Sequence, residues 1–349
     1  MNRMSSELNS RLSIIAVTRD DKFGDDAPTR YNLEQKLNND QRIKLTIECF
    51  LTQLESRGIE AEYVLVDFAP IKDNYLYENE VLRETLSDSR IKNIVVHQSA
   101  CKKMGLVADE YYEYFAKNVG LRNCTGNVIL VTNPDNFFED ALVDDIATIV
   151  KDGIVTATNE EGNSFYFRPY SRKDVTYFDN EPAARNMLNY LYGPERQSNQ
   201  PWHDSVPFEE RLQRVPGGTG FLVSHAMGKT FGDGKDPSKG DVVGTGASGD
   251  FTLASRRMFF DVVDGYDESE EVRYRPRSHS HMDSEVILKF YNAGNPPMEL
   301  SGAVLSLDHA KPFFNGPCNQ GVYENIKNWG MADYSTIKLN ENTIMVTGD

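Results

Sequence analysis

The sequence predicts an α/β protein built on an open, mostly parallel β-sheet with helices on its faces. Three observations indicate this class. Short apolar runs recur in the N-terminal part of the chain, stretches with helical spacing separate them, and polar residues follow each run. Strands of a parallel sheet have this unbroken apolar character because helices cover both faces of the sheet.

The first predicted strand spans residues 12–18, an apolar run that ends in polar residues. Residues 19–40 are polar, contain glycine and proline, and are expected to form a loop. Residues 41–57 carry apolar side chains at helical spacing, which predicts an amphipathic helix. Gly58 is expected to end that helix.

Three further strands are predicted where the apolar character returns, at 61–67, 91–97 and 127–132. A helix over 109–122 precedes the last of them. Alternation of strand and helix is typical of parallel crossover units. In such sheets ligands bind outside the carboxyl ends of the strands.

The pattern changes after residue 150. Residues 215–249 are rich in glycine and have little periodicity, which is typical of a functional loop or lid. A strand is expected at 250–255, an amphipathic helix at 283–293 and a last strand at 300–307.

Composition excludes several classes of function. The 349 residues include 37 Lys and Arg against 53 Asp and Glu, for a formal charge of −16. A chain so acidic does not hold nucleic acid or anionic lipid by general electrostatics. Any phosphate group is therefore expected to be bound by local contacts, with a metal ion or with one or two arginines.

Cysteine usage and hydropathy indicate the compartment. The four cysteines are widely spaced and form no CxxC pair, so they are expected to be reduced thiols. No apolar run reaches the length of about 18 residues that a membrane span needs. The expectation is a soluble, cytoplasmic protein without a transmembrane segment.

Polar clusters follow four of the predicted strands. They are Thr18-Arg19-Asp20, Asp67, Thr132-Asn133-Pro134-Asp135 and Asp308-His309. Carboxylates at such ends suit a ribose, a base edge or a hard divalent cation. Asp and Asn are also common wherever a strand turns into solvent, so one cluster alone leaves both interpretations open. Four clusters at one sheet edge favour a ligand site.

The order of these motifs resembles that of the nucleotide-diphospho-sugar transferases, the glycosyltransferases of the GT-A fold, and among them a broad family-two-like group. Besides the strand ends, the resemblance rests on residues 117–122, 249–253, 265–268, 281–283 with Gly294, and 328–330. It covers roughly residues 12–330, with an insertion-like region near 156–214.

The resemblance implies a GT-A-type open mixed, mainly parallel sheet flanked by helices, in a single large domain. It divides the chain into a nucleotide-sugar-binding half at 12–155 and the insertion-like region at 156–214. An acceptor and catalytic half follows at 215–315. A C-terminal tail at 316–349 is expected to pack over the site.

The function implied by the resemblance is glycosyl transfer by a hexosyl- or pentosyltransferase. The donor would be a UDP- or GDP-linked sugar, and the acceptor a hydroxyl of a glycan or another molecule. The residues implied to bind the nucleotide and donor are Thr18, Arg19, Asp67, Asn118, Arg122 and Asn133. Asp250 and Trp329 are implied to contact the donor or acceptor sugar.

A divalent ion, Mn²⁺ or Mg²⁺, is implied as the cofactor, with Asp135 and His309 as its protein ligands. The sequence departs from the family pattern here, because Asn133 stands where the family has the first aspartate of its metal motif. An Asn still offers a carbonyl oxygen, but without charge. A histidine ligand favours Mn²⁺ over Mg²⁺.

Asp283 is the implied general base of an inverting reaction. It stands at the start of a predicted helix, where the helix dipole stabilises the ionised carboxylate that a base requires at neutral pH. Asp is also a frequent N-cap, so position alone leaves both roles open. The resemblance favours the base.

Two other functions stay open at this stage. A catalytically silent nucleotide- or carbohydrate-binding protein on the same fold is one, and Asn133 is the best argument for it. A sugar nucleotidyltransferase is the other. Such enzymes use a Gly-rich loop with Arg and Lys after the first strand, and residues 18–24 lack its full form.

Overall fold

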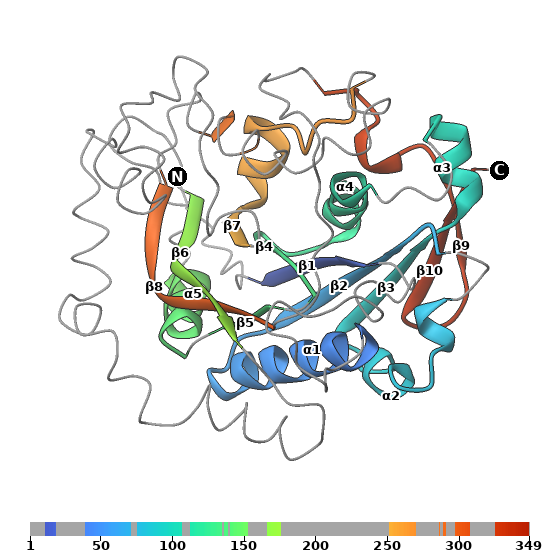
Figure 1. Cartoon of the computed structure of the whole chain (residues 1–349). Coiled ribbons are helices and arrows are strands. Elements are labelled where there is room, and N and C mark those ends of the chain that lie inside the picture. The colour runs from blue at the N-terminus through green and yellow to red at the C-terminus, as the bar shows by residue number, and fades with distance from the viewer. Residues whose placement is uncertain are drawn as a thin grey trace, which may run out of the picture.

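Figure 1 shows the computed structural model of the chain. The structure describes residues 11–18, 39–70, 75–106, 112–134, 136–138, 140–152, 166–175, 251–269, 286, 289–290, 297–307 and 325–348. Within these ranges, no helix has the length and apolar character needed to cross a membrane.

A ten-stranded sheet in the order β5-β8-β6-β7-β4-β1-β2-β3-β10-β9 forms the centre of the structure. Its parallel middle consists of β4 (Val128–Thr132), β1 (Leu12–Thr18), β2 (Ala61–Phe68), β3 (Ile91–Val96) and β10 (Thr343–Thr347). β9 (Ser335–Lys338) closes one edge antiparallel to β10. The predicted class, an open, mixed and mainly parallel α/β sheet, is confirmed.

The other side of the sheet is mixed. β7 (Phe251–Ser255) runs antiparallel to both β4 and β6 (Tyr166–Val175). β8 (Pro297–Leu307) pairs in parallel with β6 and antiparallel with β5 (Asn136–Phe138), which forms the second edge.

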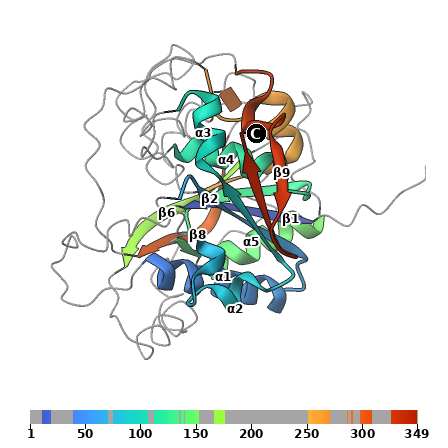
Figure 2. The same ribbon diagram turned by 90° about the vertical axis from the view of Figure 1, so that its right-hand side faces the viewer.

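Helices cover both faces of the sheet (Figures 1 and 2). One face carries α1 (Asn39–Ser56), α2 (Arg83–Leu86) and α5 (Asp140–Asp152). The other carries α3 (Gln98–Met104), α4 (Glu113–Asn123) and η5 (Met258–Val262), which is a π-helical turn. Two shorter 3₁₀ turns are η2 (Leu76–Glu78) and η7 (Trp329–Met331).

Each face of the sheet has its own hydrophobic core because successive strand side chains point to opposite sides. In β1, Ile14 belongs to the core under α1, and Ile15 to the core under α4. The α4 helix lies unusually close to β1. A Cβ at Gly120 would stand 2.4 Å from Cγ2 of Ile15, so only glycine fits there.

The predicted N-terminal elements are confirmed closely. Strands expected at 61–67, 91–97 and 127–132 form within one residue of those bounds, and the helix expected at 41–57 is α1. The helix expected at 109–122 is α4, which begins at Glu113. Strands expected at 250–255 and 300–307 are β7 and β8.

Several elements differ from the prediction. Residues 166–175, placed in an insertion-like region, form β6 inside the sheet between β8 and β7. In the C-terminal tail, β10 pairs with β3 and satisfies the backbone groups of that strand's open side, while the packing of the tail over the site stays a prediction. The Gly-rich segment 215–249 lies outside the described residues, as does the predicted helix 283–293 apart from residues 286, 289 and 290.

Candidate functional site at the carboxyl edge of the sheet

Thr18 and Asp67 stand side by side at the carboxyl ends of β1 and β2, where the register pairs them directly. Thr18 is 6% exposed and Asp67 is fully buried. Thr132 ends β4 on the other side of β1. The topology therefore brings three of the four predicted strand ends to one edge, which is where ligands bind in open α/β sheets.

The Asp67 carboxylate is held by the chain that follows it. Its Oδ2 accepts a hydrogen bond of 3.0 Å from the backbone N–H of Leu76. Between these residues the chain turns at Ala69, which has a positive φ of 51° and donates its N–H to the carbonyl of Val96. An alanine in this left-handed region costs on the order of 1 kcal/mol, and such strain is concentrated at functional sites.

Two aromatic rings flank Leu76 beside this carboxylate. The rings of Tyr75 and Tyr77 are stacked, with centroids 5.5 Å apart and an interplanar angle of 17°. Burial raises the pKa of the Tyr77 hydroxyl, as do its hydrogen bond to Glu78 and the negative charges of Glu78 and Asp67. The edge thus combines a fixed carboxylate with half-buried aromatic surface.

The turn from β4 into β5 forms the next part of the edge. The Asn136 side chain donates to the Thr132 hydroxyl at 3.1 Å, and its N–H donates to the carbonyl of Asn133 at 3.3 Å. Asn133 itself is half-buried. Asn136 pairs with Ser306 of β8, so the start of β5 and the end of β8 lie together.

Four predicted site residues lie outside the described residues: Arg19, Asp135, Asp250 and His309. Asp250 precedes Phe251, which pairs with Thr132. Asp135 precedes Asn136, and His309 follows Ser306 by three residues. Asn136 and Ser306, the described residues near the two predicted metal ligands, pair with each other.

The described part of the chain contains no cluster of three or more His, Cys, Asp or Glu side chains that could hold a metal ion. The predicted ligand pair falls outside that part. Its donor set, one carboxylate and one imidazole with the amide oxygen of Asn133 nearby in sequence, suits a borderline divalent ion. Asp283, the predicted base, also lies outside the described residues.

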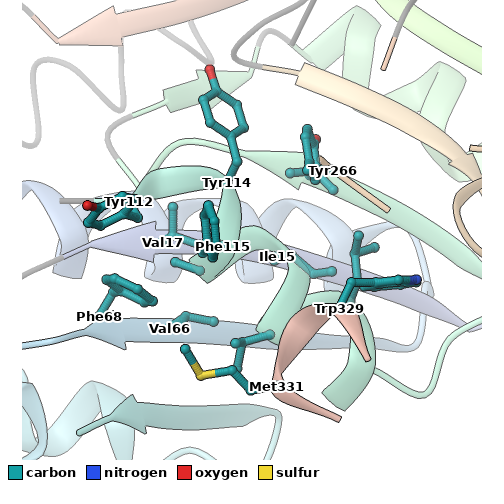
Figure 3. Close-up of a cluster of buried hydrophobic side chains, with 14 of the residues drawn as sticks. Ile15, Val17, Val66, Phe68, Tyr112, Tyr114, Phe115, Tyr266, Trp329 and Met331 are labelled. Atoms are coloured by element: carbon teal, nitrogen blue, oxygen red, sulfur yellow. The ribbon is translucent and has the colours of Figure 1, made fainter. Parts of the chain in front are cut away.

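Asn118, Arg122 and Trp329 are placed elsewhere. The α4 helix runs antiparallel to the strands, so its last turn lies at the opposite edge from Asp67. There Arg122 Nε donates to the Trp329 carbonyl at 3.0 Å. Figure 3 shows Val17, Phe68 and Tyr112 together at one end of the cluster and Trp329 toward the other.

The structure does not bring these three residues to Thr18 and Asp67. Arg122 is not brought to Thr18 and Asp67, because a helix between parallel strands ends at their amino edge. Trp329 is 1% exposed and offers no ring face to a sugar. Asn118 is fully buried, and its amide bonds to Tyr266 and Glu268. On α4, Asn118 thus bonds to residues 266–268 and Arg122 bonds to Trp329.

Comparison with known proteins gives a distant likeness. No protein-family model and no curated protein matches the chain. Among solved structures, S. aureus TarS 1–349 shares 14% identity over 85% of this chain and 60% of that chain, with a TM-score of 0.40. TarS 1–349 in complex with UDP-GlcNAc shares 12% over 88% and 61%, with a TM-score of 0.41.

A third similar structure, S. aureus TarS, shares 14% identity over 85% of this chain and 36% of that chain, with a TM-score of 0.40. The chain thus spans about three fifths of the first two chains and about a third of the third. Identities and scores this low assign no activity to this chain.

Proposed function

We propose that the chain is a glycosyltransferase that moves a sugar from a UDP- or GDP-linked donor to an acceptor hydroxyl. The observation that carries the proposal is the pairing of Thr18 with the buried Asp67 at the carboxyl edge of a parallel α/β sheet. A carboxylate fixed at this edge is suited to accept hydrogen bonds from a ribose or a base.

The order of the sequence motifs supports the same proposal. Asn136, Phe251 and Ser306, described residues near positions 135, 250 and 309, lie at strand ends of this edge. A nucleotide bound beside Asp67 would therefore direct its diphosphate toward the β4, β5 and β8 side. Asp67, Thr18 and Arg19 would hold the nucleoside, and Asn133 and Asp250 would contact the donor.

Mn²⁺ or Mg²⁺ is proposed as the cofactor, held by Asp135 and His309. When bound, such an ion neutralises the negative charge of the leaving diphosphate. Asn133 would add an uncharged oxygen. Asp283 is proposed to remove the acceptor proton, which requires a single carboxylate and no protein nucleophile and therefore inverts the anomeric centre.

A binding protein without turnover is the second candidate, and Asn133 favours it because an uncharged side chain weakens a metal site. One experiment separates the two. UDP- and GDP-sugars with Mn²⁺ are screened by thermal shift and by release of nucleoside diphosphate. A glycosyltransferase releases diphosphate from the sugar that stabilises it. Stabilisation without release, even with a panel of acceptors, would support the binding protein.

A further inference from the structure

Residues 264–269 run along α4 in the direction opposite to the helix. Asp264 lies at the last turn of α4, where its Oδ1 accepts a 2.6 Å hydrogen bond from the Trp329 indole. Tyr266 lies further toward the start, with its ring centroid 5.4 Å from that of Tyr114. From Asp264 to Tyr266 the segment therefore passes from the last turn of α4 toward its first turns.

Asn118 holds the middle of this segment with both ends of its amide. Its Nδ2 donates to the carbonyl of Tyr266 at 2.8 Å, and its Oδ1 accepts from the N–H of Tyr266 at 2.8 Å. The segment packs tightly against its neighbours at this point. A Cβ at Gly265 would stand 2.9 Å from both Asn118 and the Trp329 ring.

Glu268 joins three segments at a fully buried position. Its Oε1 accepts from Asn118 Nδ2 at 2.7 Å and from the N–H of Gly330 at 2.9 Å. A buried carboxylate is tolerated only when hydrogen bonds compensate its lost hydration. The carboxylate therefore requires α4, the 264–269 segment and the C-terminal segment to be together.

Asn325 contributes the matching contacts from the C-terminal segment. Its Nδ2 donates to the carbonyls of Asp264 and Tyr266, both at 2.7 Å. Its Oδ1 accepts from the N–H of Glu268 at 2.9 Å. The side chain thus binds the backbone of residues 264, 266 and 268, which lie outside any strand or helix.

We infer that Asn118, Glu268 and Asn325 are positioning residues, which fix the path of residues 264–269 toward the catalytic edge. The inference rests on the proposed function, since the reaction for which these residues position the chain is glycosyl transfer. The C-terminal segment 325–331 then contributes to the catalytic half, although it lies at the last turn of α4. Errors of about 1 Å in such a path cost on the order of 100-fold in rate.

The test compares Asn325→Ala with Asn342→Ala. Asn342 is a matched control because its Nδ2 also donates to two backbone carbonyls, those of Leu86 and Asp88. Like Asn325, it connects the C-terminal part of the chain to residues distant in sequence. Three quantities are measured for both variants: the dissociation constant of the nucleoside diphosphate, kcat for transfer, and hydrogen exchange of the amides in 264–269.

Asn325→Ala is expected to lower kcat by about 10- to 100-fold with nucleotide affinity unchanged, and to raise exchange in 264–269. Asn342→Ala is expected to leave all three close to wild type. Equal effects in the two variants, or an Asn325→Ala variant with normal kcat, would overturn the inference. A wild-type protein that turns over no donor would refute the proposed function instead. Unchanged hydrogen exchange of residues 264–269 in Asn325→Ala would still refute the positioning role.

Discussion

The guanidinium of Arg122 lies 3.6 Å from the centroid of the Trp329 ring and covers its face. Burial lowers the pKa of Arg122, and the nearby positive charge of Arg256 acts in the same direction, whereas Asp264 and Glu268 oppose both. An arginine nevertheless stays charged. Stacked and hydrogen-bonded to the same residue, Arg122 ties the end of α4 to the C-terminal segment.

Gly330 allows this contact, and its replacement is the first prediction. Gly330 has φ of +67°, and a Cβ there would stand 2.6 Å from the Asn118 carbonyl and 2.7 Å from Arg122 Cγ. Gly330→Ala should therefore destabilise the protein by more than the roughly 1 kcal/mol that a left-handed alanine costs alone.

Gly58 provides the matched control, because it has the same φ of +67° and nothing within 4 Å of its Cβ position. Urea unfolding of Gly58→Ala measures the conformational cost alone. The difference between the two variants is the cost of the contact with α4. Equal losses in both would mean that the C-terminal segment does not pack here as described.

The second prediction concerns Asp67. Asp67→Asn keeps an oxygen that can accept from the Leu76 N–H but removes the charge, so the fold should be preserved. Nucleotide binding should weaken by about 1.5–3 kcal/mol, the value of a hydrogen bond to a charged group. Titration calorimetry measures the loss. Glu80→Gln, in the same loop and exposed, should bind nucleotide normally.

The strands of the N-terminal part could be predicted from the sequence because burial on both faces leaves a simple signature. All seven residues of β1 and all eight of β2 are buried. β6 lacks that signature, since the run Tyr166–Val175 contains a proline and several charged residues. β10 is only five residues long and follows a polar region.

The positions of candidate site residues could be predicted only where the strand order alone determines them. Thr18 and Asp67 end adjacent parallel strands, so their proximity follows from strand order. The motif at 117–122 correctly indicated a helix but not which of its ends faces the ligand edge. Asn325 gave no signal at all, because its partners are backbone groups that are distant in sequence.

The third prediction concerns the metal ion. Turnover should stop with EDTA and return with Mn²⁺ in excess. His309→Ala and Asp135→Ala should each raise the Mn²⁺ concentration required for half-maximal rate, because each removes one of few protein ligands. Electron paramagnetic resonance of Mn²⁺ with nucleoside diphosphate measures binding without turnover. Full activity in EDTA would exclude the assignment.

The fourth prediction is a pH dependence of stability at the amino edge of the sheet. Burial raises the pKa of Glu62, but hydrogen bonds from Ser13 and Thr125 and the charge of Arg11 outweigh it and lower the pKa below its ordinary value of 4.5. A lowered pKa stabilises the fold above the ordinary value and loses this effect as the pH falls through the folded-state pKa.

Glu62→Gln should therefore be less stable than wild type at neutral pH, and the difference should shrink as the pH falls below about 4.5. Thermal unfolding between neutral and acid pH measures this. Glu60→Gln is the control, because its side chain is 72% exposed and its ion pair with Arg11 spans 3.7 Å. A difference that grows toward acid pH would contradict the assigned charge state.

The fifth prediction concerns the mechanism. Asp283→Asn should bind the donor normally and turn over about 10²–10⁴-fold more slowly, because a general base acts in the transition state and not in ground-state binding. Asp261→Asn, an exposed carboxylate of η5, should remain fully active. NMR of the product reports the anomeric configuration, which a single displacement inverts. Retention of configuration, or normal turnover by Asp283→Asn, would remove Asp283 from the mechanism while leaving the nucleotide site at Asp67 untouched.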